Sequence, residues 1–118
     1  MTAGVRLFRL RDTPMSNYGE GPGSAEIARL IGPDSSKTMG AYFARFDGRS
    51  VPWTVHYDEI ILCISGTFRL RTADDVHELG PGDMLWIGSG TELHYEGEDA
   101  TVFIAIAPVN WRDQQPAA

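Results

Sequence analysis

The sequence contains only one cysteine, Cys63, and only one lysine, Lys37, among its 118 residues. A single cysteine excludes an internal disulfide and a zinc site built from several cysteines. The 16 acidic residues outnumber the 10 basic ones, so the formal net charge is −6. Because nucleic acids and anionic membranes attract cationic surfaces, this balance argues against either of them as a partner.

The sequence also contains no apolar run as long as the roughly 20 residues that a membrane-spanning helix needs. The segment Met1–Arg6 lacks the apolar centre of a signal peptide, so we expect a cytoplasmic protein. With 42% apolar and 22% charged residues, we expect one domain over 1–118. Within it we expect a barrel over 35–112, an N-terminal strand, loop and short helix over 1–34, and a tail over 113–118.

Thirteen glycines and seven prolines divide the chain into short segments, which is typical of hairpins and not of a helical bundle. Beyond residue 38, short apolar segments follow one another, and a turn signal comes after each. Such spacing predicts an all-β sandwich or a small barrel. The expected strands are Met39–Phe46, Trp53–Tyr57, Glu59–Ile64, Thr67–Arg71, Val76–Leu79, Met84–Ile87, Glu92–Tyr95 and Thr101–Ala107.

The first third of the chain has a different pattern, which predicts a strand, a loop and a helix. Over Val5–Leu10 the side chains of Val5, Leu7 and Arg9 would alternate with those of Arg6, Phe8 and Leu10 between two faces, which predicts a first strand. Residues 12–23 are polar and rich in glycine, and we expect them to form a loop or lid. The segment Ser24–Ile31 has apolar residues at helical spacing, a possible N-cap at Ser24 and a stop at Gly32-Pro33, so it is the one helix candidate.

Two segments in the second half resemble the motifs of the cupins, which are small jelly-roll barrels. The segment Trp53–Gly66 is similar to the first motif, His-x-His followed by Glu and Gly, and it matches at Glu59 and Gly66. The segment Gly82–Leu93 is similar to the second cupin motif, in which glycines, a proline and a histidine recur at fixed spacing, and it matches at Gly82 and Gly90. The resemblance implies an all-β fold, a single-domain cupin with an antiparallel jelly-roll barrel and one short N-terminal helix.

The metal-binding positions of the cupin motifs are apolar in this sequence. By resemblance, the family's three histidines would fall at Trp53, Val55 and Leu93. Indole, isopropyl and isobutyl groups donate no electron pair to a metal ion. We therefore expect a pocket without a tightly held metal or other cofactor.

A metal-dependent cupin with a rebuilt site is the alternative to this interpretation. It would bind a divalent metal such as Zn, Ni, Fe or Mn through His56, Glu59 and His94. Alternation along a strand places Tyr57 and Glu59 on one face and His56 and Asp58 on the other. The rebuilt site therefore requires both histidines to point inward against the alternation.

Within the cupins, residues 35–112 most resemble the cupin domain of the EutQ family of ethanolamine-utilization proteins. The similar stretches are Met39–Phe43, Pro52–Thr54, Tyr57–Ile60, Gly82-Asp83 and Pro108–Trp111. This resemblance implies an association with ethanolamine-degrading microcompartments and an acetate kinase activity. The sequence itself has no glycine-rich phosphate loop, and Lys37 lies in a stretch without glycines. A small-molecule pocket is therefore better supported than phosphoryl transfer.

Glu59 is the main candidate for chemistry. A carboxyl group facing an apolar barrel has a raised pKa, which is how a general acid or base is made. Tyr57 would share its face and can donate its hydroxyl to a carbonyl or carboxylate oxygen. A structural alternative pairs Glu59 with Arg45 at the barrel mouth. The residues expected to bind substrate are Trp53, Tyr42, Arg45, Tyr95, Val55 and Leu93.

These observations favour a small-molecule metabolic enzyme of the isomerase, lyase or hydratase type. Its substrate would be a small carbonyl or carboxylate compound, and the loop 12–23 and the C-terminal tail would shape the pocket. A non-catalytic metabolite-binding or scaffold protein is an alternative from another class. We also expect a homodimer, since cupins commonly pair through their sheets and Val5–Leu10 suits edge pairing. We expect Cys63 to be a small buried apolar group.

Overall fold

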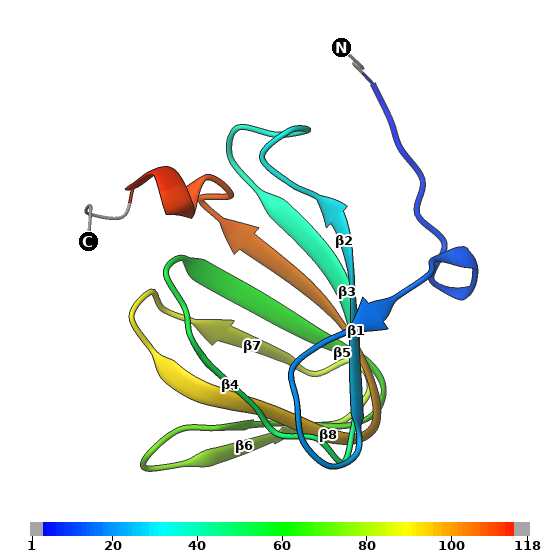
Figure 1. Cartoon of the computed structure of the whole chain (residues 1–118), viewed down its shortest axis with the longest axis vertical. Coiled ribbons are helices and arrows are strands. Elements are labelled where there is room, and N and C mark those ends of the chain that lie inside the picture. The colour runs from blue at the N-terminus through cyan, green and yellow to red at the C-terminus, as the bar shows by residue number, and fades with distance from the viewer. Residues whose placement is uncertain (1–3, 115–118) are drawn as a thin grey trace.

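The computed structural model describes residues 4–114, which form an eight-stranded antiparallel sheet that curls into an open barrel (Figure 1). The chain ends 1–3 and 115–118 lie outside the described residues, and with them most of the expected tail. No helix within 4–114 is long and apolar enough to cross a membrane. In chain order the elements are the 3-10 helix η1 (Leu10–Asp12), β1 (Ser16–Asn17), β2 (Ser24–Ile31), β3 (Gly40–Asp47), β4 (Val51–Thr54), β5 (Asp58–Arg71), β6 (Val76–Leu79), β7 (Met84–Ile87), β8 (Glu92–Ala107) and the 3-10 helix η2 (Trp111–Gln114).

The long strands β5 and β8 form the centre of the sheet. The strand order is β1-β2-β3-β8-β5-β6, while β4 pairs with β8 and β7 pairs with β5. The first half of β5 pairs with the second half of β8. The second half of β5 pairs with the first half of β8. Each strand therefore contributes to both sides of the barrel. The four segments expected over Glu59–Ile64, Thr67–Arg71, Glu92–Tyr95 and Thr101–Ala107 are accordingly two continuous strands.

A bulge bends β5 where the sequence predicts a break between two strands. The register with β8 shifts between Cys63 and Thr67. Within this bulge Gly66 has a φ of 74°, and a Cβ atom there would overlap the backbone of Asp99. Glycine is required because only it combines a positive φ with so close a backbone approach.

The predicted helix over Ser24–Ile31 is wrong, because this segment is the strand β2. It pairs with β3 over its whole length, and the register shifts between Arg29 and Ile31. This irregularity breaks the two-residue alternation, so the apolar residues fall at a spacing that resembles a helix. The only helical turn in the described N-terminal part is η1, at Leu10–Asp12.

The predicted first strand over Val5–Leu10 is also wrong. These residues run away from the barrel without pairing to another strand (Figure 1). Val5 is 95% exposed, and Leu7 is exposed as well. A strand needs a neighbour for its backbone hydrogen bonds, and the first strand of the sheet is instead β1, which lies within the expected loop 12–23 and pairs with β2.

The interior of the barrel follows the alternation expected from the sequence. Val55, Tyr57 and Glu59 are buried, whereas Asp58 between them is exposed. Cys63 is buried as predicted. Around these residues the core contains Phe46, Phe68, Ile61, Val102, Leu70, Leu79, Ile87 and Ile106.

The outer face of β5 and β7 is apolar and exposed. Ile60, Leu62 and Ile64 point outward from β5, and Met84 and Trp86 point outward from β7. Trp86 lies opposite Ile60, and Met84 lies opposite Leu62 in the register of the two strands. We refer to these five residues as the apolar outer face.

Candidate functional site

A cavity of about 660 Å³ extends into the barrel beside Glu59, and we call it the interior cavity. This volume is in the usual range of small-molecule sites. Strands β2, β3, β4, β5 and β8 all contribute to its wall. Its aromatic and acidic lining residues are Tyr18, Tyr42, Tyr57, Tyr95, Trp53, Trp111, Glu59 and Glu20. Arg29, Arg112 and Glu20 are the charged, exposed lining residues, and they mark the mouth.

Glu59 is a buried carboxyl group at the wall of the interior cavity. It is only 2% exposed, and its Oε1 atom accepts a hydrogen bond of 2.8 Å from the hydroxyl of Tyr95. Burial raises the pKa of Glu59 to about 7, and the hydrogen bond from Tyr95 opposes part of that rise. Within residues 4–114 no arginine or lysine forms an ion pair with Glu59. The group is therefore held by a neutral phenol in a poorly solvated site.

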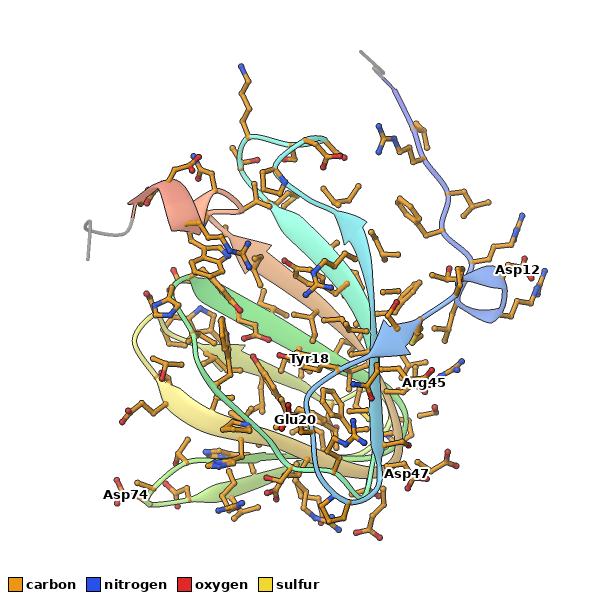
Figure 2. All side chains as sticks on the ribbon, in the orientation of Figure 1. Asp12, Tyr18, Glu20, Arg45, Asp47 and Asp74 are labelled. Atoms are coloured by element: carbon orange, nitrogen blue, oxygen red, sulfur yellow. The ribbon has the colours of Figure 1, made fainter. Side chains whose placement is uncertain are left out.

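The expected pairing of Glu59 with Arg45 is wrong. Arg45 is exposed and lies between buried Ala44 and Phe46 on β3, so it points to the outside of the sheet. Figure 2 shows Arg45 on the outer side, while Tyr18 points into the barrel. Arg45 does not line the interior cavity. The alternation along β3 places it on the outer side of the sheet.

Tyr57 presents a hydroxyl group to the interior cavity. Its oxygen accepts a hydrogen bond of 2.8 Å from Nε1 of Trp53, so the phenolic hydrogen stays available for a ligand. Burial raises the pKa of Tyr57, the charge of Glu59 raises it further, and the bond from Trp53 lowers it. Burial likewise raises the pKa of Tyr42, and raises that of Tyr18 to about 12. The phenols are therefore neutral donors at physiological pH.

The predicted substrate-binding residues divide into two groups. Trp53, Tyr42 and Tyr95 line the interior cavity. Val55 and Leu93 do not line it, because both are packed in the hydrophobic core. Of the three positions at which the cupin motifs place histidines, only the one occupied by Trp53 faces the cavity.

The residues present do not fit a cupin metal site. His94 lies between two buried residues of β8 and faces the outer surface. The ring of His56 stacks on that of Trp111, with 5.1 Å between the ring centroids. Neither histidine lines the interior cavity with Glu59. The described part of the chain contains no cluster of three or more histidine, cysteine, aspartate or glutamate side chains placed to hold a metal. The geometry that the rebuilt site requires is therefore not met.

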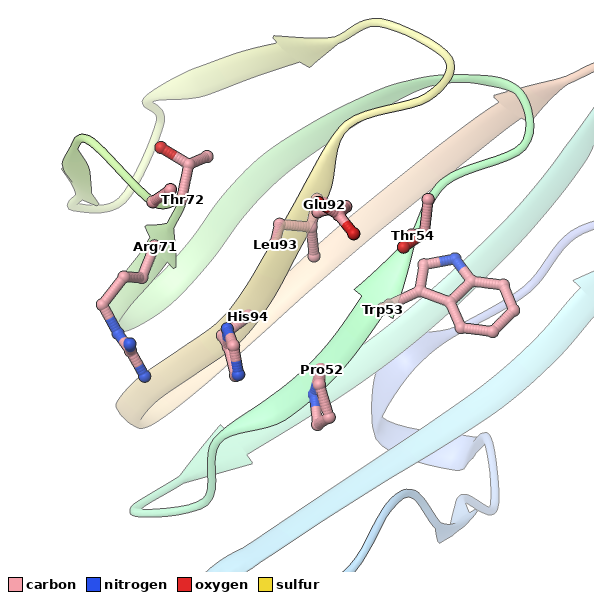
Figure 3. Close-up of a pocket in the computed structure, with 9 residues that line it drawn as sticks. Pro52, Trp53, Thr54, Arg71, Thr72, Glu92, Leu93 and His94 are labelled. Atoms are coloured by element: carbon pink, nitrogen blue, oxygen red, sulfur yellow. The ribbon is translucent and has the colours of Figure 1, made fainter.

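A second hollow, of about 520 Å³, lies on the outer side of β4 and β8 (Figure 3). It shares Pro52 and Trp53 with the interior cavity. Its arginine, Arg71, forms an ion pair with Glu96, so that charge is already satisfied within the protein. The hollow is lined by Pro52, Trp53, Thr54, Arg71, Thr72, Ala73, Glu92, Leu93 and His94. The buried carboxyl group makes the interior cavity the stronger candidate site.

Several residues that line the cavity are not among those predicted from the sequence. The loop 12–23 supplies Tyr18, and the C-terminal end supplies Trp111 and Arg112. Tyr18 is the only aromatic residue of that polar loop, which is a signal that could have found it. Arg29 lies on β2, whose apolar spacing predicts a helix, so the sequence does not indicate that its side chain faces the cavity. The expectation that the loop 12–23 shapes the pocket is confirmed. The expected tail over 113–118 supplies no lining residue within the described part of the chain, and the C-terminal contribution comes from the end of the expected barrel over 35–112.

A small antiparallel barrel with its cavity inside is the fold of the cupins, and solved cupins align with this chain. Residues 15–113 match the family described as Ethanolamine utilisation protein EutQ. The chain belongs to this EutQ family.

The curated relatives are longer proteins. Acetate kinase EutQ of Escherichia coli (strain K12) is 26% identical over 95 residues, which cover 80% of this chain and 41% of that protein. The chain thus spans about two fifths of the length of this relative. The similarity over this part of the relative agrees with membership of the family. It does not extend to the rest of the relative.

Two solved structures illustrate the breadth of the fold. The ethanolamine utilization protein Q of Salmonella typhimurium LT2 aligns with a TM-score of 0.80 and 23% identity, covering 90% of this chain and 88% of that chain. The polyketide cyclase RemF of Streptomyces resistomycificus aligns with a TM-score of 0.71 and 20% identity, covering 90% of this chain and 80% of that chain. At these identities the likeness shows the fold alone.

Proposed function

We propose that this chain is a small-molecule enzyme that uses Glu59 as a general acid or base within the interior cavity. The observation that carries the proposal is a carboxyl group, 2% exposed, whose pKa is raised to about 7 by burial. At neutral pH such a group populates its acid and base forms in comparable amounts, which suits proton transfer in both directions. A cavity of about 660 Å³ accommodates a metabolite-sized substrate.

The contacts of Glu59 and Tyr57 define a proton-transfer step on a carbonyl compound. Tyr95 holds Oε1 of Glu59, which leaves Oε2 to take a proton from a carbon next to the carbonyl. The bonding pair of that C–H bond moves into the carbon skeleton, and negative charge develops on the carbonyl oxygen. The hydroxyl of Tyr57 donates a hydrogen bond to this oxygen. Glu59 then returns the proton to the same carbon, which exchanges that hydrogen with solvent. Where a carbon–carbon double bond adjoins that carbon, the bonding pairs shift along the skeleton, and return of the proton to the far carbon of the double bond completes an isomerisation.

The alternatives to this proposal are an acetate kinase and a non-catalytic metabolite-binding protein. The relatives are named acetate kinases, yet the only lysine of this chain, Lys37, is exposed between β2 and β3 and does not line the cavity. A metabolite-binding protein would use the same cavity without turnover. The named activity of RemF, polyketide cyclase, supports an enzyme, because it shows that this fold carries catalysis in another chain.

The test follows deuterium incorporation into small 2-oxo acids and aldehydes, with pyruvate as the first probe. Proton NMR in D₂O would measure exchange at the carbon next to the carbonyl. We expect the native chain to accelerate exchange, with a rate that rises as pH increases through about 7 as Glu59 ionises. Glu59→Gln should lower the rate by about 100-fold or more.

A matched control replaces the exposed carboxylate Glu78, which pairs with Arg69 outside the cavity, in the variant Glu78→Gln. This variant should exchange at the native rate. Exchange that is equal in the native chain and Glu59→Gln would refute the proposal, as would no exchange by the native chain with any probe. Transfer of phosphate from ATP to acetate that persists in Glu59→Gln would favour the activity for which the relatives are named.

A further inference from the structure

Two arginines from distant parts of the chain line the interior cavity at its mouth. Arg29 lies on β2 directly opposite Tyr42 of β3, so the two side chains share one face of the sheet. Arg112 belongs to η2, near the end of the described chain. Both line the cavity, and the positive charge of each acts on Tyr42, lowering the pKa that burial raises. The fold thus brings two guanidinium groups around one phenol.

Neither arginine has an acidic partner within residues 4–114. The ion pairs there use other arginines. Arg112 instead lies over the ring of Trp111, with its guanidinium carbon 4.2 Å from the ring centroid. Stacking fixes the plane of a guanidinium group and leaves its N–H donors free at the edge.

These arginines also do not serve to keep Glu59 ionised. Burial and the bond from Tyr95 are the causes that set its pKa, and no arginine is among them. The mouth carries two arginines against one carboxylate, Glu20, so its formal charge is positive. This charge and the buried carboxyl group in the wall are therefore separate features of the same cavity. Apolar and aromatic residues, among them Ile27, Trp53 and Ile104, line the rest of the cavity wall. A ligand that suits this arrangement has one charged end and an uncharged carbon skeleton.

We propose that the interior cavity binds small molecules through a single anionic head group, a carboxylate or a phosphate, held at the mouth by Arg29 and Arg112 with the hydroxyl of Tyr42. Planar guanidinium groups form paired hydrogen bonds with the oxygens of such anions. The uncharged remainder of the ligand then points inward to Glu59. This inference rests on the proposed function for the identity of the site and names its substrate class.

The first experiment titrates the protein with sodium acetate and, separately, with sodium phosphate at constant ionic strength. The signals of the arginine side-chain Nε–H groups in ¹⁵N–¹H spectra report binding at each guanidinium. We expect saturable shifts at Arg29 and Arg112 with at least one of the two anions. The neutral analogue acetamide should produce none. Comparison of acetate with phosphate decides whether the head group is a carboxylate or a phosphate.

The variants Arg29→Gln and Arg112→Gln should each weaken binding of the same anion by about tenfold or more, because each loses a charge-assisted hydrogen bond. Arg45→Gln is the matched control, since Arg45 is an exposed arginine on the outer face of β3. It should bind like the native chain. The thermal unfolding midpoint of each variant checks that the barrel is intact, and Arg29→Lys should restore part of the affinity.

Three results would overturn the proposal: no saturable shift with either anion, equal binding by acetamide, or native affinity in both Arg29→Gln and Arg112→Gln. Glu59→Gln separates this inference from the proposed function. It should bind the anion with native affinity while losing proton exchange. Anion binding without exchange in the native chain would refute the acid–base chemistry alone, and exchange without dependence on the arginines would refute the head-group site alone.

Discussion

Replacement of Glu59 by glutamine tests the central electrostatic feature of this protein without any substrate. Glutamine has nearly the same shape and can still accept the hydrogen bond from Tyr95 through its oxygen. It cannot ionise. The variant therefore removes the titration of one buried group and changes little in the packing of the barrel.

The magnitude follows from the two pKa values of Glu59. Burial raises its pKa from 4.5 to about 7 on folding, and this difference, at about 1.4 kcal/mol for each pKa unit, corresponds to about 3 kcal/mol. Because the folded pKa is the higher one, the folded protein binds more protons between these pH values. The contribution of protonated Glu59 to stability is fully present below pH 4.5 and is lost as pH rises through about 7.

Urea unfolding at a series of pH values from 4 to 8 would measure this effect. The free energy of unfolding of the native chain minus that of Glu59→Gln should fall by about 3 kcal/mol across this range and level off above it. Glu78→Gln, which changes an exposed carboxylate, controls for the loss of one negative charge. A difference that does not vary with pH, or that grows as pH rises, would refute the argument that burial dominates at this site.

Further predictions concern single contacts. Tyr95→Phe removes the hydrogen bond that lowers the pKa of Glu59, so in the same unfolding series the fall in stability should still begin near pH 4.5 but should level off at a higher pH than in the native chain. Gly66→Ala should lower the unfolding free energy by about 2 kcal/mol or more in urea titrations, because its Cβ would meet the backbone of Asp99 at a positive φ. Trp86→Arg places a charge in the apolar outer face, and light scattering should show the expected homodimer converting to monomer; a native chain that is already monomeric would contradict the expectation.

Local sequence patterns predicted the strand faces around the candidate site. Alternation alone placed Tyr57 and Glu59 inside and Asp58 outside, because successive side chains of a strand point to opposite faces whatever their partners are. The strands Val76–Leu79 and Met84–Ile87 were predicted with their observed bounds for a similar reason. Turn residues flank the two segments in the sequence, with Gly80-Pro81-Gly82 between them and Gly88-Ser89-Gly90 after the second.

Patterns failed where pairing with a distant strand decides the structure. The segment Ser24–Ile31 contains an irregular pairing with β3, and the resulting spacing of apolar residues mimics a helix. Val5–Leu10 alternates like a strand but has no neighbouring strand among the described residues. Arg45 was assigned to the pocket without knowledge of which face of β3 is inside, and its buried neighbours show that it points out.

Local sequence was sufficient to place a carboxyl group on the apolar face of a cupin-like strand and to show that the usual imidazole ligands are missing around it. The groups that contact or face this carboxyl group follow from the folded barrel. Tyr95 reaches Glu59 from β8, and Arg29 and Arg112 reach the cavity mouth from opposite ends of the chain. The physical reason is that strand faces are a local property of the backbone, whereas contacts between strands depend on register and barrel closure, which involve residues far apart in the sequence.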